Sequence, residues 1–288
     1  MDDGTCARLG ERHYLMTTTT AAAGQVMRHL EFVAQVLWPG WDVRMVSVTE
    51  QWAQFAVAGP QARDLLNALL EAPIDDAGFP FMGCGAVSVG GVAARLFRIS
   101  FSGEHAYEIA VPARYGAALF KELVARAEAM GGGAYGMEAL NVLRIEKGFI
   151  THAEIHGRVT AHDIGMQGMM SGKKEFVGKA AASRVGLLDP ERERLVGLKP
   201  LGAVKELLPG AHLFEEGAEA VSANDQGYVT SACYSPTLGH VIGQAFLRRG
   251  PERIGERVRM VDHLRGSETV CEVTGVVQYD PDGGRLRG

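Results

Sequence analysis

A lone carboxylate stands in the apolar second part of RISFSGEHAYEIAVP, a stretch that covers residues 98–112 and carries a Ser-Gly-Glu-His insert at its middle. Glu108 lies between Tyr107 and Ile109 in that stretch. If the stretch is an alternating strand, Phe101, Tyr107 and Glu108 can line a pocket wall with aromatic rings beside one carboxylate, as suits a flat heteroaromatic ligand. The same pattern also fits an edge strand on which Glu108 faces solvent, because single glutamates are usually exposed. Residue types alone leave both interpretations open.

Three histidines, His152, His156 and His162, fall in the short segment HAEIHGRVTAHD and raise the question of a metal site. Glu154 lies between the first two histidines, whereas the zinc peptidase motif places the glutamate directly after the first histidine. Gly157, followed by β-branched residues, argues against a helix that would hold both histidines on one face. We therefore expect solvated loop histidines and no metal site.

Other motifs that could carry chemistry fail on their context. The glycine groups MGCGAVSVGG and GGGAYG do not lie between a strand and an opening helix, so we expect no FAD or NAD site. The lysines of SGKKEFVGKAA could hold an anion, although a solvated basic patch is the commoner arrangement. No Gly-x-Ser-x-Gly segment is present, and no cysteine has a convincing histidine partner for covalent catalysis.

Composition limits the possible partners. The chain has 288 residues, 47% of them hydrophobic, and a formal net charge of -5, so it can bury a large core and has no general attraction for nucleic acid or anionic membrane surfaces. No apolar stretch is long enough for a membrane helix, and no signal peptide precedes the first charged residues. Its four cysteines form no Cys-x-x-Cys pair, so we expect reduced thiols and a cytoplasmic location.

The elements that must position Glu108 follow from local patterns. Residues 14–37 predict a short strand, a threonine-rich cap and an amphipathic helix, and residues 41–60 predict two strands. Gly90-Gly91 separates two alternating runs and predicts a hairpin. Two helical patterns follow, at residues 114–130 and 135–149. The sequence therefore predicts an α+β domain in its first part.

From about Arg194 the pattern changes to short strands at close spacing, joined by Gly, Pro and Asp turns. This pattern predicts a small all-β barrel. The boundary is expected in ASRVGLLDPERER, where a charge run follows turn-forming residues. We accordingly predict two domains, at residues 1–190 and 191–288.

Four blocks occur in order along the chain: RISFSGEHAYEIAVP, YGMEALNVLRIEKGF, KKEFVGK and SPTLGHVIGQAFL. Together they resemble the glycine cleavage T-protein (aminomethyltransferase) superfamily, and within it the C-terminal tetrahydrofolate-binding half of the sarcosine oxidase alpha subunit. The resemblance implies a T-protein-like folate-binding domain of antiparallel sheets with helices, shortened at its N-terminus, followed by the all-β barrel. It also implies that a partner chain, such as another sarcosine oxidase subunit, or a missing N-terminal part completes the folate pocket.

The resemblance assigns roles to particular residues. The family holds the pterin of tetrahydrofolate with the last glutamate of Gly-Glu-x-x-[FY]-Glu, which is Glu108 here. Phe101 occupies the place of a stacking tyrosine, and Tyr107 is expected to line the same pocket. The catalytic aspartate is the second of an Asp-Asp pair and falls on Asp3. Its implied role is to orient and stabilise developing positive charge during one-carbon capture.

The implied activity is a tetrahydrofolate-dependent one-carbon transferase that captures a methylene-imine or formaldehyde-level unit and gives 5,10-methylenetetrahydrofolate. Leu140 replaces an arginine of glycine-cleavage members, which favours the sarcosine oxidase side. A non-catalytic folate-binding or scaffolding subunit and a folate-dependent demethylase are the alternatives. Iron-sulfur-assembly relatives carry Lys-Gly-Cys where this chain has Phe149 after Lys147-Gly148, so we exclude that role.

Overall fold

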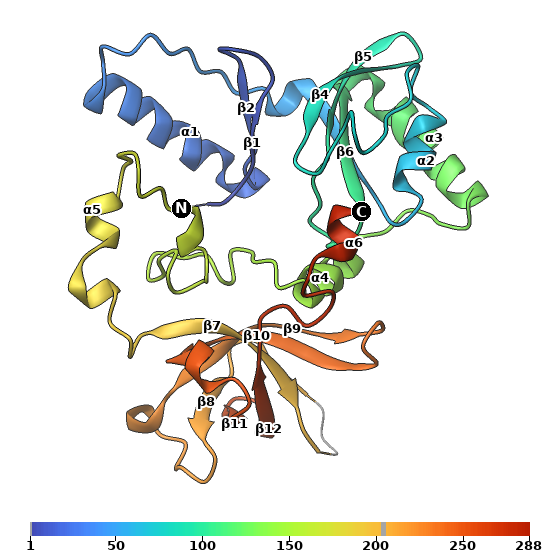
Figure 1. The fold of residues 1–288 in the computed structure, drawn as a ribbon. Coiled ribbons are helices and arrows are strands. Elements are labelled where there is room, and N and C mark those ends of the chain that lie inside the picture. The colour runs from blue at the N-terminus through green and yellow to red at the C-terminus, as the bar shows by residue number, and fades with distance from the viewer. Residues whose placement is uncertain (1, 203–205) are drawn as a thin grey trace. The chain divides into compact units, whose positions relative to one another are not determined.

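The computed structural model describes residues 2–202 and 206–288 (Figure 1). The chain forms two compact units, the first built from residues 1–136 with 283–288 and the second from residues 137–282. Each unit has its own hydrophobic core. The domain boundary expected at residue 190 stays a prediction. In the described ranges, no helix has both the length and the apolar character that crossing a membrane requires.

The first unit contains a four-stranded antiparallel sheet, in the order β3-β6-β5-β4. Its strands are β3 (Trp52–Ala58), β4 (Cys84–Val89), β5 (Val92–Phe97) and β6 (Ala106–Pro112). The predicted hairpin is confirmed: Gly90 and Gly91 join β4 to β5 with φ of +55° and +76°, which glycine adopts without strain. The sheet places β6, the strand that carries Glu108, between two neighbours.

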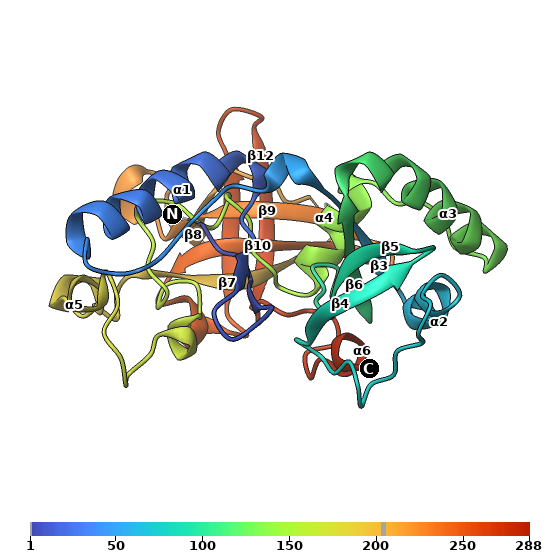
Figure 2. The ribbon, with the colours of Figure 1, turned by 90° about the horizontal axis from the view of Figure 1, so that it is seen from above.

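One face of this sheet packs against α2 (Ala62–Asn67) and α3 (Gly116–Ala129), and both Figure 1 and Figure 2 show these helices beside it. Leu65 and Leu66 of α2 and Leu119 of α3 are buried in the core against Ile109 of β6. Gly116 begins α3 where an added Cβ would lie 2.5 Å from the Ala53 side chain, so glycine lets the helix approach the sheet.

The N-terminal segment forms a hairpin of β1 (Cys6–Arg8) and β2 (Tyr14–Met16), followed by helix α1 (Ala23–Phe32). The predicted order of a short strand and a helix is confirmed here, but no threonine side chain caps α1, whose N-cap residue is Ala22. No side chain of α1 is buried in the structure. The first of the two strands predicted in residues 41–60 is wrong, because residues 43–48 have no regular structure and only β3 forms.

The second unit contains a closed six-stranded barrel, in the order β10-β7-β12-β11-β8-β9, in which every neighbouring pair is antiparallel. The predicted all-β barrel is confirmed. Its strands are β7 (Glu193–Pro200), β8 (His212–Glu215), β9 (Gly227–Ser235), β10 (His240–Arg248), β11 (Arg257–Asp262) and β12 (Ser267–Thr274). Alternate aliphatic side chains of these strands fill the interior, as β-barrels of this size require.

Helix α4 (Met137–Glu146) and the four-residue helix α5 (Lys179–Ala182) also belong to the second unit, whereas the C-terminal helix α6 (Gly284–Arg287) belongs to the first. The single-turn elements are η1 (Thr20–Ala22), η2 (Val33–Leu37), η3 (Thr49–Gln51), η4 (Ala113–Tyr115), η5 (Gln167–Met169), η6 (Val185–Leu187), η7 (Ser222–Asn224) and η8 (Gly250–Arg253).

Candidate functional site

Glu108 lies on the face of the first unit's sheet that points away from α2 and α3. Its neighbours Tyr107 and Ile109 point into the core, and alternation therefore puts Glu108 on the opposite face, which we call the open face. The side chain is half-buried. Because β6 is an interior strand, the interpretation of Glu108 as a residue of an edge strand is wrong.

Both small and large side chains surround Glu108 on the open face. The registers of β3 and β5 on β6 place Ala56 and Phe97 opposite Glu108. They place Gln54 and Arg95 opposite Ala110, the next residue of β6 on that face. The alanines of this face are Ala56, Ala58, Ala86, Ala93, Ala106 and Ala110. Small side chains leave room for a flat ligand to lie against the sheet.

The Gln54 side-chain amide donates a hydrogen bond to the Glu108 carboxylate. Burial raises the pKa of Glu108, and the bond from Gln54 lowers it in part. Among the residues that the structure describes, no cation pairs with this carboxylate, so its negative charge is only partly compensated. Burial is the main cause of a raised pKa of Tyr135, and the Glu108 carboxylate raises this pKa further. The Tyr135 phenol therefore lies within electrostatic range of Glu108.

The structure does not bring Tyr107 together with Glu108. Tyr107 is 0% exposed and belongs to the core, where its hydroxyl lies 3.2 Å from Nε2 of His105. The predicted pocket wall shared by these two neighbours is wrong, because consecutive residues of a strand face opposite sides of the sheet. His105 Nδ1 accepts a hydrogen bond from Arg98, since arginine can only donate, and Nε2 then donates to the Tyr107 oxygen.

Phe101 lies in the loop between β5 and β6, and 39% of its surface is exposed. The loop is tied down from α6, where Arg285 donates bidentate hydrogen bonds of 2.8 and 2.9 Å to the Glu104 carboxylate. Buried Arg98 reaches the same helix and donates to the Leu286 carbonyl at 3.2 Å. These contacts fix the loop that leads into Glu108.

Asp3 is exposed in the segment that precedes β1. The segment is held rather than frayed: Asp2 accepts hydrogen bonds from the backbone and hydroxyl of Thr19, at 2.9 and 3.2 Å. A Cβ on Gly4 would lie 2.0 Å from the Thr17 carbonyl oxygen, so only glycine permits this close approach. These contacts hold the backbone on both sides of Asp3.

The hairpin that follows Asp3 contacts the sheet on the side of the open face. The Cys84 thiol lies 3.7 Å from the Arg8 carbonyl oxygen, and Cys84 shares a register row with Phe97 and Glu108. The hairpin that follows Asp3 therefore lies on the same side of the sheet as Glu108.

Glu154, at the centre of the histidine segment, has a structural role in the second unit. It is 0% exposed and forms an ion pair with Arg144 at 3.3 Å, while Ser231 and the backbone of Thr151 donate to its carboxylate at 2.6 and 2.8 Å. Gln244 accepts from the same arginine at 2.8 Å. Among the residues that the structure describes, no group of three His, Cys, Asp or Glu side chains could hold a metal ion.

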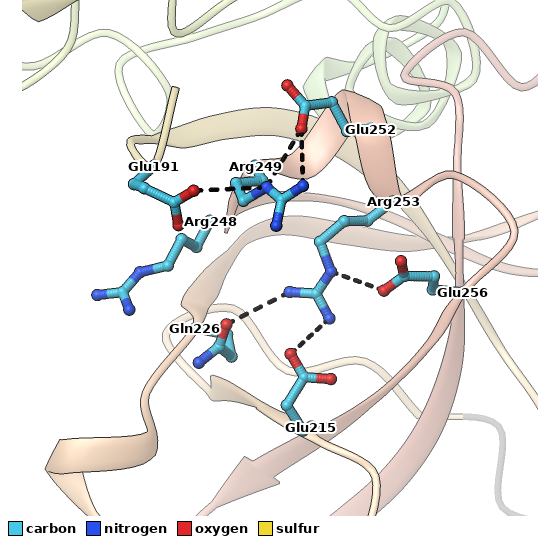
Figure 3. A pocket seen from close by; sticks show the side chains of 8 residues that line it. All are labelled: Glu191, Glu215, Gln226, Arg248, Arg249, Glu252, Arg253 and Glu256. Atoms are coloured by element: carbon cyan, nitrogen blue, oxygen red, sulfur yellow. Dashed lines mark hydrogen bonds and ion pairs between the residues drawn. The ribbon is translucent and has the colours of Figure 1, made fainter. Parts of the chain in front are cut away.

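The barrel also carries a cavity of about 320 Å³ (Figure 3). Its lining residues are all polar or charged: Glu191, Glu215, Gln226, Arg248, Arg249, Glu252, Arg253 and Glu256. Arg253 is paired with two carboxylates at 2.8 Å, and Arg249 is paired with a third at 3.2 Å. Because these charges compensate one another, we interpret the cavity as an ion-pair network of the barrel surface.

Sequence reasoning missed Gln54 and Tyr135. Gln54 had a detectable signal, because it is a polar residue inside the apolar run WAQFAVA, as Glu108 is inside its own run. Tyr135 had none, since it follows three glycines outside any periodic pattern.

Comparisons with known proteins agree with this architecture. The family model described as GCVT N-terminal domain matches residues 1–174, and the one described as Glycine cleavage T-protein C-terminal barrel domain matches residues 193–280. A crystal structure of glycine cleavage system aminomethyltransferase T from Bartonella henselae superposes with a TM-score of 0.81 at 23% identity, covering 98% of this chain and 73% of that one, which shows the same fold.

Among curated proteins, the sarcosine oxidase subunit alpha of Rhizobium meliloti is 49% identical over 99% of this chain, and that of Corynebacterium sp. (strain P-1) is 39% identical over 100%. The chain spans only 29% and 30% of the lengths of these two proteins. The aminomethyltransferase of Streptomyces coelicolor is 28% identical over 97% of this chain and 73% of its own length. With both family models in chain order and this fold, the chain belongs to the glycine cleavage T-protein family.

Proposed function

We propose that this chain is a tetrahydrofolate-binding one-carbon transferase module of a sarcosine-oxidase-type complex. In this function it captures a methylene-imine or formaldehyde-level unit and gives 5,10-methylenetetrahydrofolate. The observation that carries the proposal is the half-buried carboxylate of Glu108, which lies on the open face between Ala56 and Phe97 and has an amide as its hydrogen-bonding partner. Family membership and the names of the relatives support it.

The residues present fit the aminopyrimidine edge of a reduced folate. Such an edge carries two parallel N–H donors, and a carboxylate accepts two parallel hydrogen bonds. The Gln54 amide, which now donates to Glu108, is a single neutral donor of the same type. Each charge-assisted bond from a ligand contributes about 1.5–3 kcal/mol, so replacement of the amide by the ligand edge favours binding.

In the proposed reaction, bound tetrahydrofolate supplies the nucleophilic nitrogens that take up the one-carbon unit. The chain's own residues bind and orient. Glu108 fixes one end of the ligand against the sheet, and Asp3, on the segment held by Gly4 and Asp2, supplies a negative charge near developing positive charge. No covalent bond to the protein is required.

A non-catalytic folate-binding or scaffolding subunit is the second candidate, and the exposed position of Asp3 favours it. This function predicts that replacing Asp3 with Asn leaves one-carbon transfer by the assembled complex unchanged. The transferase, in contrast, loses rate in that variant because the negative charge is removed.

The proposal is tested by calorimetric titration of the chain with tetrahydrofolate under anaerobic conditions, for the wild type and Glu108→Gln. We expect binding by the wild type and a loss of about 2–5 kcal/mol in the variant, as when one side of a buried charge-assisted pair is removed. Glu122→Gln, on the exposed surface of α3, is the matched control and should bind as the wild type does. Equal affinities of Glu108→Gln and the wild type, or no binding by the wild type, would contradict the proposal.

A further inference from the structure

The open face carries a second charged group, Arg95, whose charge no carboxylate compensates. Its guanidinium carbon lies 3.9 Å from the centroid of the Trp52 ring, in a cation–π contact. Burial lowers the pKa of Arg95, and no neighbouring carboxylate raises it. A half-buried arginine usually has an anionic partner, because an unpaired charge is costly to desolvate.

The strand registers define where this pair lies relative to Glu108. Arg95 of β5 is opposite Ala110 of β6, and Trp52 of β3 is opposite Pro112. Because β6 lies between β3 and β5, the contact between Arg95 and Trp52 must cross β6, where the small side chain of Ala110 leaves space. All these residues share the open face with Glu108.

The spacing indicates the kind of ligand that could reach both charges. Pro112 lies four residues beyond Glu108 on β6, which corresponds to about 13 Å at the usual rise of a strand. Arg95 is opposite Ala110, and its side chain extends toward Trp52, in the direction away from Glu108. A ligand that contacts both ends must therefore be elongated, with hydrogen-bond donors at one end and an anionic group at the other.

We propose that Arg95, held flat by Trp52, binds a glutamate carboxylate of the folate tail while Glu108 holds the aminopyrimidine edge. This inference rests on the function proposed above. A guanidinium stacked on a ring keeps its N–H groups directed outward from its rim, and this planar fork matches a carboxylate.

Another oxygen could use the same guanidinium, namely the carbonyl of the pteridine ring. The two sources differ in a property that can be tested, because replacing the ligand's glutamate by an amide removes every carboxylate of the tail and leaves the pteridine carbonyl. The lean of Arg95 toward Trp52, away from Glu108, favours the carboxylate.

The experiment is a double-mutant cycle between protein and ligand, measured by anaerobic calorimetry. The ligands are tetrahydrofolate and tetrahydropteroyl amide, in which an NH2 group replaces the glutamate and no carboxylate remains. The proteins are the wild type, Arg95→Gln, Arg95→Lys and Glu108→Gln. Arg114→Gln is the matched control, since Arg114 is likewise stacked on an aromatic ring, Tyr115, which packs against the core. Far-ultraviolet circular dichroism checks that each variant is folded.

We expect Arg95→Gln to weaken tetrahydrofolate binding about tenfold or more and to leave binding of the tetrahydropteroyl amide unchanged, because only the first ligand loses a charge-assisted contact. Arg95→Lys should retain part of the affinity. Removal of the glutamate should weaken binding to the wild type but not to Arg95→Gln. An equal loss for both ligands would overturn the inference in favour of the pteridine carbonyl, and no loss for either would overturn it entirely. If Glu108→Gln loses affinity for both ligands and Arg95→Gln loses affinity for neither, the proposed function is supported and the inference about Arg95 is overturned.

Discussion

Two glutamates of this chain, Glu154 and Glu108, are wholly or partly buried, and they differ in the way that their negative charge is compensated. Glu154 in the second unit is fully buried and receives an ion pair from Arg144 together with hydrogen bonds from Ser231 and Thr151. Glu108 in the first unit is half-buried and receives a hydrogen bond from one neutral amide. The first carboxylate is satisfied by the fold, and the second has acceptor capacity left over.

The difference separates a structural carboxylate from a ligand-binding one. A buried charge must be paired and fully hydrogen-bonded, or it costs several kcal/mol of stability. Where a fold leaves a half-buried carboxylate with one neutral donor, an external partner would supply the missing hydrogen bonds. By this criterion the histidine segment, which looked more like a site in the sequence, is the structural element, and the open face is the site.

Breaking the ion pair between Glu154 and Arg144 should have the largest effect, which is on the stability of the fold. We expect Glu154→Gln to lower the free energy of unfolding by about 3–5 kcal/mol, because Arg144 is then left as an uncompensated buried charge. Urea denaturation followed by circular dichroism measures this loss. The double variant Arg144→Met with Glu154→Leu should recover much of it, since no buried charge then remains. A loss of less than about 1 kcal/mol in Glu154→Gln would show that the pair is not a structural one.

The second effect concerns the segment that holds Asp3. In Gly4→Ala, the new Cβ meets the Thr17 carbonyl oxygen at 2.0 Å, so the segment must shift. Because a displacement of about 1 Å can cost about 100-fold in rate, we expect a loss of about 10- to 100-fold in one-carbon transfer. The rate is measured above the uncatalysed condensation of formaldehyde with tetrahydrofolate.

Gly24→Ala is the control for Gly4→Ala, because nothing lies within 4 Å of the new Cβ in helix α1 and alanine favours a helix. Tetrahydrofolate affinity should change little in either variant if Glu108 is the main anchor. A wild-type transfer rate in Gly4→Ala would mean that the position of Asp3 is unimportant, which would favour the non-catalytic function.

Much of the fold could be predicted from local sequence signals. The hairpin at Gly90-Gly91, the helix around residues 116–129 and five of the barrel strands follow from alternation, helical periodicity and turn residues. The strand predicted within residues 41–48 failed because alternation alone does not form a strand without a partner, and Val43 and Val46 are 48% and 75% exposed there. Strand β8, only four residues long, gave too short a pattern to be recognised.

The site was predictable only in part, for a related reason. Glu108 was visible because a carboxylate interrupts an apolar run. Its partner Gln54 lies 54 residues earlier in the chain, and only strand pairing brings the two together. Tyr107 was misassigned because the motif treated neighbouring residues as one group, whereas the pleat of a strand sends them to opposite faces.

The smallest effect is a pH dependence that distinguishes Glu108 from a solvated glutamate. Burial raises its pKa above the ordinary 4.5, so the folded state binds protons more readily than the unfolded state does. The stability that protonation provides is present below pH 4.5 and is lost as pH rises through the folded pKa. Glu108→Gln should therefore gain stability relative to the wild type across that rise, by about 0.5 kcal/mol or less. Urea midpoints at pH 4.5 and 7.5 measure the change, with Glu122→Gln as the exposed control. A difference that shrinks as pH rises would mean that the Glu108 charge is compensated as fully as that of Glu154.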